Sequence, residues 1–317
     1  MVRQQEVMRL LIAYDGSGYS HNALQDLRWA GLPEKADVLM VSVAEVWLSP
    51  LADQTRDDDF SDEDIREYFQ KHSEQIDRNV TQTEQILIDA KAELQNKFPK
   101  WAIETESIAG SPSQVILQKT TDFVPDLVVV GPRGLSSDRG TGLGSVSQTV
   151  LSYSRFPVRI GRGSFGTGVD QLKIAICFDG SACSLDAVKA AAARDWQKNA
   201  EFTLFVVTDP FIELIPGRAF QVIPGLSEYR MTGEIRWVKT LADEAIGILE
   251  NSGLTTSVQI YSGNPRIMLA NGSTEWKADT VFVGMNSRRS NLLGCVASAV
   301  AARSPCSVEV IPRSNDR

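Results

Sequence analysis

A glycine-rich segment in the first half of the chain has the residue types of a phosphate-binding loop. It reads Gly131-Pro-Arg-Gly134, then nine residues, then Gly144-Ser145-Val146-Ser147. Glycines let the backbone approach a ligand without an intervening Cβ, and free N–H groups at a helix N-terminus attract anions. The Ser145 hydroxyl can cap that helix or donate to a phosphate oxygen. The segment indicates binding of a phosphorylated ligand; the alternative is an ordinary glycine-rich surface loop.

Two predicted elements hold the ends of this loop. The apolar run 127–130 before it is typical of a buried strand, and 146–154 after it is predicted to be a helix. The sequence contains no G-x-x-x-x-G-K-[ST] segment, and no G-x-G-x-x-G follows the first predicted strand. The P-loop and the dinucleotide-binding fingerprint are therefore excluded at the level of motifs.

The bulk composition favours a globular, acidic protein with two domains. The chain has 317 residues, which is more than one core usually spans. Its net charge of −8 argues against a nucleic-acid-binding surface, which needs a basic excess. No apolar run approaches the roughly 20 residues of a membrane span, and the first residues lack the apolar core of a signal peptide.

The chemistry-bearing side chains are few. The four cysteines lie in the second half without C-x-x-C spacing, at Cys177, Cys183, Cys295 and Cys306. They are expected to be reduced thiols, which favours a cytoplasmic location. The only histidines are His21 and His72, too few for zinc chemistry or a Ser-His-Asp triad, so no residue is assigned to a metal.

The chain repeats one unit. Asp15-Gly16-Ser17 is matched by Asp179-Gly180-Ser181, and Gly110-Ser-Pro112 by Gly263-Asn-Pro265. In the first half, strands are predicted at 8–14, 37–45, 101–108, 127–130 and 157–160, with helices at 20–30, 62–98, 112–121 and 146–154. In the second half, strands are predicted at 172–178, 202–207, 257–261, 280–283 and 307–311, with helices at 185–196, 229–251, 265–275 and 294–302. We expect domains at 1–163 and 171–317, joined by a glycine-rich linker at 164–170.

Short apolar strands alternating with helices give parallel sheets covered on both faces. Ligands of such α/β folds bind beyond the carboxyl ends of the strands, where the strand order reverses. Asp15 ends the first strand, so its carboxylate can accept hydrogen bonds from an adenine amino group or ribose hydroxyls there. The alternative is a plain helix cap or turn residue.

The glycine spacing in its strand–helix context resembles the ATP-binding branch of the universal stress protein family, and the likeness covers nearly the whole chain as a tandem two-domain member. It implies two Rossmann-like (adenine nucleotide alpha hydrolase-like) domains. Each would be a five-stranded parallel sheet of order 3-2-1-4-5, and the domains would join through their last strands.

The resemblance also implies a site for ATP, with or without Mg²⁺, in the first domain. Asp15 would face the adenosine, and Val43 would offer backbone groups to the adenine. The residues expected along the ribose and phosphates are Val130, Gly131, Arg133 and Gly134, and those expected at the phosphate tail are Gly144, Ser145 and Val146.

The second half departs from this pattern. Its loop reads Gly284-Met-Asn-Ser287, six residues, and Gly294-Cys295, so it is three residues shorter and lacks the second glycine and the serine. Asp179, Val207, Gly284 and Gly294 would form at most a weak second site for an adenosine. We therefore expect one competent nucleotide site, in the first half.

The sequence predicts an ATP-binding regulatory or stress-response protein. No base-plus-nucleophile set is visible, so at most slow ATP hydrolysis is expected. Three alternatives stay open: a nucleotide-free dimerisation or scaffold module, an adenylyl-transferring enzyme of the same broad α/β superfamily, and binding of an apolar small molecule by the second domain through the apolar loop at 211–226. The expected partners are an adenine nucleotide and the other half of the chain, with no nucleic acid and no membrane. A homodimer of chains is left open.

Overall fold

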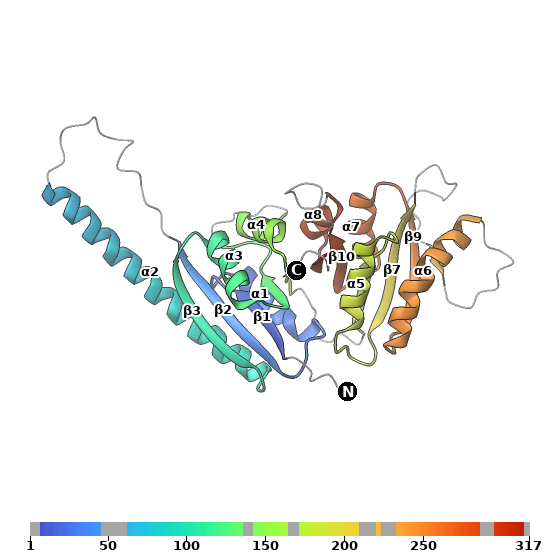
Figure 1. Cartoon of the computed structure of the whole chain (residues 1–317), viewed down its shortest axis with the longest axis horizontal. Coiled ribbons are helices and arrows are strands. Elements are labelled where there is room, and N and C mark those ends of the chain that lie inside the picture. The colour runs from blue at the N-terminus through green and yellow to red at the C-terminus, as the bar shows by residue number, and fades with distance from the viewer. Residues whose placement is uncertain are drawn as a thin grey trace, which may run out of the picture.

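The computed structural model describes residues 7–45, 62–135, 142–163, 171–208, 220–222, 233–285 and 295–313 (Figure 1). The first half contains β1 (Met8–Ala13), α1 (Gly18–Asp26), η1 (Leu27–Trp29), β2 (Ala36–Glu45), α2 (Asp62–Lys97), β3 (Ala102–Gly110), α3 (Pro112–Phe123), β4 (Leu127–Val130), α4 (Ser145–Tyr153) and β5 (Val158–Ile160). The second half contains β6 (Lys173–Cys177), α5 (Ala182–Ala192), β7 (Glu201–Thr208), β8 (Phe220–Val222), α6 (Gly233–Asn251), β9 (Thr256–Ser262), α7 (Pro265–Glu275), β10 (Thr280–Met285), α8 (Cys295–Arg303) and β11 (Ser307–Pro312).

The strands form one eleven-stranded sheet of order β3-β2-β1-β4-β5-β11-β10-β6-β7-β9-β8. Within each half the repeated strands are parallel and have the predicted order 3-2-1-4-5. The predicted α/β fold is therefore confirmed.

The second half differs from the prediction at its edge. Residues 220–222, expected within a loop, form strand β8, which pairs antiparallel with β9 so that Gln221 lies opposite Gln259. The other residues of the expected loop at 211–226 lie outside the described residues. The second half of the sheet is thus not purely parallel, because this short strand pairs with the outer edge of β9.

Strands β5 and β11 join the two halves. They pair antiparallel, with Val158, Arg159 and Ile160 opposite Val310, Glu309 and Val308. This is the join through the last strands that the sequence predicted. Because this pairing is antiparallel, the parallel strands of the first half run in the opposite direction to those of the second half. The carboxyl ends of the two sets of strands therefore point in opposite directions along the continuous sheet.

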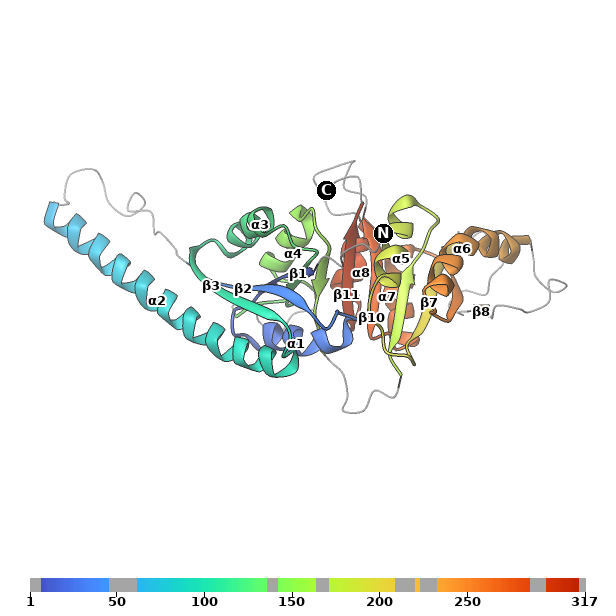
Figure 2. The same cartoon turned by 60° about the horizontal axis from the view of Figure 1, so that its bottom comes forward.

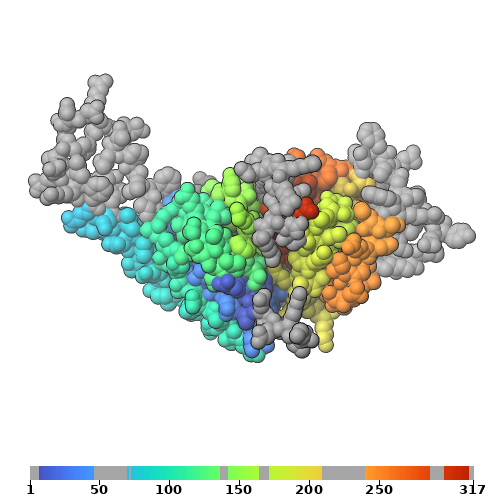
Figure 3. Space-filling view, viewed as in Figure 1, coloured from blue at the N-terminus to red at the C-terminus, as the bar shows by residue number. Residues whose placement is uncertain are grey.

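Helices cover both faces of the sheet. Figure 2 shows α3 and α4 on one side of β2 and β3, with α1 and α2 on the other. One buried apolar cluster runs through both halves, from Val128 and Val150 to Val300 and Val308. Separate clusters lie on the opposite face of each half. In the space-filling view the first half (blue to green) and the second half (yellow to red) lie side by side, with α2 at the far end (Figure 3).

Two helices begin earlier than predicted because serines cap them. The Ser20 N–H donates to Ser17 Oγ (3.1 Å), and the Ser184 N–H donates to Ser181 Oγ (3.2 Å). Such a cap satisfies a backbone donor that the first helical turn leaves without a partner. Helices α1 and α5 therefore start directly after the Asp-Gly-Ser turns.

Candidate functional site

The Asp-Gly-Ser turn has the same geometry in both halves. The Ser17 N–H donates to Asp15 Oδ1, and the Ser181 N–H donates to Asp179 Oδ1, each at 3.0 Å. The glycines between them have φ of +76° and +77°, a region that favours glycine. The turn role considered as an alternative for Asp15 is therefore seen in the structure, and it uses only one of the two carboxylate oxygens.

The second oxygen of Asp15 contacts the start of the glycine loop. The Leu135 N–H donates to Asp15 Oδ2 at 3.1 Å. A Cβ added to Gly134 would lie only 2.6 Å from the same oxygen, so a larger residue at this position would displace the Asp15 carboxylate. Asp15 and Gly134, which are far apart in the sequence, thus lie together at the end of β1.

The other end of the loop folds back on its beginning. The Gly144 N–H donates to Pro132 O (2.8 Å), and Arg133 Nε donates to Gly142 O (3.0 Å). Gly144 is the N-cap of α4, and it has no side chain to accept from the first turn. Of the two roles considered for the Ser145 hydroxyl, the helix cap is wrong, because Ser145 is already the first residue of α4. Residues 136–141 of the loop lie outside the described residues.

One site residue was missed by sequence reasoning. Ser147, in the first turn of α4, is buried, and its hydroxyl donates to Gly131 O at 2.6 Å. This bond ties the start of α4 to the end of β4. The available signal was the helical spacing of Ser147 with the apolar Val150 and Leu151, which puts a hydroxyl on the core-facing side of α4.

The remaining predicted residues lie at the carboxyl ends of adjacent strands. Val41 of β2 pairs with Ala13 of β1, so Val43 lies just beyond the end of β1. Val130 ends β4, and both Val43 and Val146 pack on the shared apolar cluster. Since β1 lies between β2 and β4, this corner is the point at which the strand order reverses.

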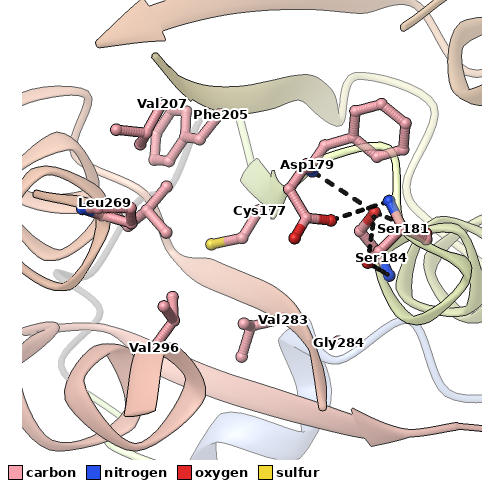
Figure 4. A pocket seen from close by; sticks show the side chains of 12 residues that line it. Cys177, Asp179, Ser181, Ser184, Phe205, Val207, Leu269, Val283, Gly284 and Val296 are labelled. Atoms are coloured by element: carbon pink, nitrogen blue, oxygen red, sulfur yellow. Dashed lines mark hydrogen bonds between the residues drawn. The ribbon is translucent and has the colours of Figure 1, made fainter. Parts of the chain in front are cut away.

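The second half has a cavity of about 150 Å³ at the equivalent corner (Figure 4). The repeat relates Asp179, Val207, Val283, Gly284 and Val296 to the first-half residues Asp15, Val43, Val130, Gly131 and Val146. All five line the cavity, together with Cys177, Phe178, Ser181, Ser184, Phe205, Pro265 and Leu269. Three of the four residues expected for a weak second site are therefore brought together; the fourth, Gly294, lies outside the described residues.

The titratable groups of this cavity have well-defined protonation states. Burial alone would raise the pKa of Asp179, but hydrogen bonds from Ser181 and Ser184 outweigh it and lower that pKa. Burial raises the pKa of the Cys177 thiol far above its ordinary value. At neutral pH the cavity therefore presents a carboxylate and an uncharged thiol.

Neither a metal centre nor a membrane span is found among the residues that the structure describes. No group of three or more His, Cys, Asp or Glu side chains in them could hold a metal ion. None of their helices has the length and apolar character needed to cross a bilayer.

A family model described as "Universal stress protein family" matches residues 6–161 and 172–312. A universal stress protein of Mycobacterium tuberculosis is 35% identical over 91 residues, which cover 28% of this chain and 30% of that protein. The crystal structure of a universal stress protein from Archaeoglobus fulgidus has a TM-score of 0.60 at 22% identity, covering 96% of this chain and 98% of that chain.

A solved family member with AMP bound, from Arabidopsis thaliana, is similar to one half of the chain. It is 16% identical, has a TM-score of 0.33 and covers 46% of this chain and 94% of that chain. At this level of similarity the bound AMP is a finding about the Arabidopsis protein and is not carried over to this chain.

Proposed function

This chain belongs to the universal stress protein family, and we propose that it is a regulatory, stress-response protein that binds ATP in its first half. The observation that best supports this is how the two described ends of the glycine segment are held. Asp15 holds the first end through Leu135, and the Gly144 N–H at the other end donates to Pro132 O. Both ends thus lie directly before the N-terminus of α4, which no side chain caps and which suits a phosphate chain.

The polar groups at this corner match the two ends of ATP. Asp15 supplies a carboxylate at the end of β1, and each carboxylate oxygen can accept more than one hydrogen bond. It can therefore keep its contacts to Ser17 and Leu135 while accepting from ribose hydroxyls or the adenine amino group. The first turn of α4 and the Arg133 guanidinium supply the positive potential that phosphates require.

The proposed role is binding rather than efficient catalysis. The nine residues of the proposed site include one carboxylate and no histidine, lysine or cysteine, so no base-plus-nucleophile pair is present among them. We propose that ATP acts by favouring one conformation of the loop, with hydrolysis slow at most. Mg²⁺ could accompany the phosphates, but these nine residues contain no carboxylate pair for it.

We further propose that residues 1–163 and 171–317 are the two domains and that 164–170 link them. A cytoplasmic setting is also proposed, since Cys177, Cys183 and Cys306 are free thiols in the structure.

The test is a calorimetric titration of the full chain with ATP, comparing Gly144→Val with the wild type. Gly144 has φ of −73°, so valine is allowed there, but an added Cβ lies 3.3 Å from the Arg133 Cα. A larger side chain therefore crowds the loop and covers the N-terminus of α4. We expect one ATP bound per wild-type chain and at least a tenfold loss of affinity in Gly144→Val.

Gly247→Val is the matched control, because nothing lies within 4 Å of a Cβ added there. It should bind ATP like the wild type. Equal affinities for all three proteins would reject this site. Absence of ATP binding by the wild type would favour a nucleotide-free scaffold with a purely structural loop.

A further inference from the structure

The cavity of the second half combines apolar walls with a single carboxylate. It lies between the ends of β6, β7 and β10 and the helices α7 and α8, and most of its walls are apolar (Figure 4). Phe205 and Val207 contribute from β7, Val283 from β10, Leu269 from α7 and Val296 from α8. These walls favour a ligand with an apolar body.

The size of the cavity corresponds to one aromatic ring. An apolar protein cavity of about 150 Å³ can hold a benzene molecule, whereas sites for larger ligands usually span about 300–1,000 Å³. Two residues that line this corner are larger in the second half than in the first. Phe205 stands where the first half has Val41, and Cys177 stands where it has Ala13.

The larger side chains are also held in place. The Phe205 ring contacts Tyr261 edge-on, with centroids 5.3 Å apart, and Trp276 in the same manner at 5.9 Å. Tyr261 is itself buried, and its hydroxyl donates to Gln259 (2.8 Å). Because neighbours on two sides hold the Phe205 ring, the cavity cannot easily widen to accept a nucleotide.

One charged group gives the cavity its polarity. Asp179 is the only charged side chain among the lining residues. Its Oδ1 accepts from the Ser181 N–H, while its other oxygen is drawn toward the cavity without a dashed bond (Figure 4). A carboxylate at the rim of a mostly apolar cavity attracts a cationic hydrogen-bond donor.

We propose that this cavity binds a primary alkylamine that carries one aromatic ring, with the ring between Phe205, Leu269 and Val283 and the ammonium group on Asp179. The site is distinct from the proposed ATP site. The antiparallel join makes the strands of the two halves run in opposite directions, so the carboxyl ends that carry the two sites point in opposite directions. It requires no covalent step, since the neutral Cys177 thiol acts only as part of the wall.

Benzylamine is the probe, titrated into the full chain by calorimetry at neutral pH. Asp179→Asn keeps an oxygen that can accept from Ser181 and so preserves the turn, but it removes the negative charge. We expect benzylamine to bind the wild type and to lose at least tenfold in affinity for Asp179→Asn. The exposed Asp243→Asn makes the same change of net charge elsewhere in the second half and should leave the affinity unchanged.

A second variant tests the location of the ring. Val207→Phe fills the cavity while leaving Asp179 in place, and it should abolish binding. Retained binding in Val207→Phe would overturn the cavity as the site. Recognition of the amine would be overturned if the wild type bound toluene as tightly as benzylamine. It would also be overturned if Asp179→Asn bound benzylamine as tightly as the wild type. Displacement of benzylamine by AMP would overturn the distinction from a nucleotide site.

Discussion

The buried thiol of Cys306 makes the free energy of unfolding fall as the pH becomes alkaline. Burial raises its pKa from 9.0 to about 12, although the Arg162 guanidinium opposes this rise. In the unfolded chain the thiol ionises near its ordinary pKa. The contribution of the buried, neutral thiol to the free energy of unfolding is therefore fully present below about pH 9 and is lost as the pH rises toward 12. The expected loss is about 1.4 kcal/mol per pH unit in that window.

Urea unfolding of the wild type and Cys306→Ala between pH 8 and pH 11 measures this effect. The free energy of unfolding should fall less steeply with pH in the variant, because other groups titrate alike in both proteins. Parallel curves would show that Cys306 ionises equally in the folded and unfolded states.

Individual residues differ in how far the sequence could place them. The Asp-Gly-Ser turns were predictable because their hydrogen bonds join residues two or three positions apart. The bond from Leu135 to Asp15 crosses 120 positions and exists only because β1 and β4 are neighbours in the sheet. Sequence reasoning put Asp15 near the loop through a family resemblance, but it could not reveal this contact.

At the level of elements, α4 is held to the sheet by one hydrogen bond that the second half lacks. Ser147 donates to Gly131 O, whereas its counterpart in α8 is Ala297, which has no hydroxyl. Ser147→Ala leaves a buried carbonyl without this partner, so we expect the unfolding free energy to fall by about 1–3 kcal/mol.

Ser152→Ala is the control within the same helix. Its hydroxyl bonds only to Gln148 O at an exposed position, so the change in unfolding free energy should stay within about 0.5 kcal/mol. Equal effects of the two substitutions in urea unfolding would mean that the bond to Gly131 adds nothing to stability.

The elements were more predictable than their exact ends and edges. Helix α2 was expected at 62–98 and spans Asp62–Lys97, because a long amphipathic pattern leaves little ambiguity. Strand β8 was missed, since three residues carry too little periodicity to indicate a strand. Its pairing depends on the exposed edge of β9, which no local pattern around Phe220–Val222 shows.

At the level of the whole molecule, a buried network of charges joins the halves. Arg159 is fully buried and donates to Asp26 Oδ2 (2.6 Å) and to Thr280 Oγ1 (3.1 Å). Its guanidinium also lies 3.5 Å from Glu309, which Arg194 contacts as well. Two buried carboxylates thus meet two guanidinium groups from different parts of the chain.

Arg159→Leu should destabilise the full chain by about 3–5 kcal/mol, because it leaves the Asp26 carboxylate buried without its cation. Arg155→Leu, at an exposed position four residues earlier, is the matched control and should change stability little. Denaturant unfolding measures both. A difference of under 1 kcal/mol between them would show that the network contributes little.

The sequence indicated the join between the halves but not its chemistry. Each half was predicted to end in a strand, at 157–160 and 307–311, and the family resemblance implied that these strands join. The partners of Arg159 lie 133 and 150 positions away, so nothing local in Val158–Ile160 distinguished a buried arginine from an exposed one.

The same pair of strands determines which strands can join in this register. Arg159 stands at the centre of the β5–β11 register, opposite Glu309. Two copies of β5 paired in this register would oppose arginine to arginine, and two copies of β11 would oppose glutamate to glutamate. Pairing of β5 with β11 therefore matches unlike charges, and deleting either half would leave one charge of this register unmatched. The join thus favours two different halves in one chain over two copies of the same half.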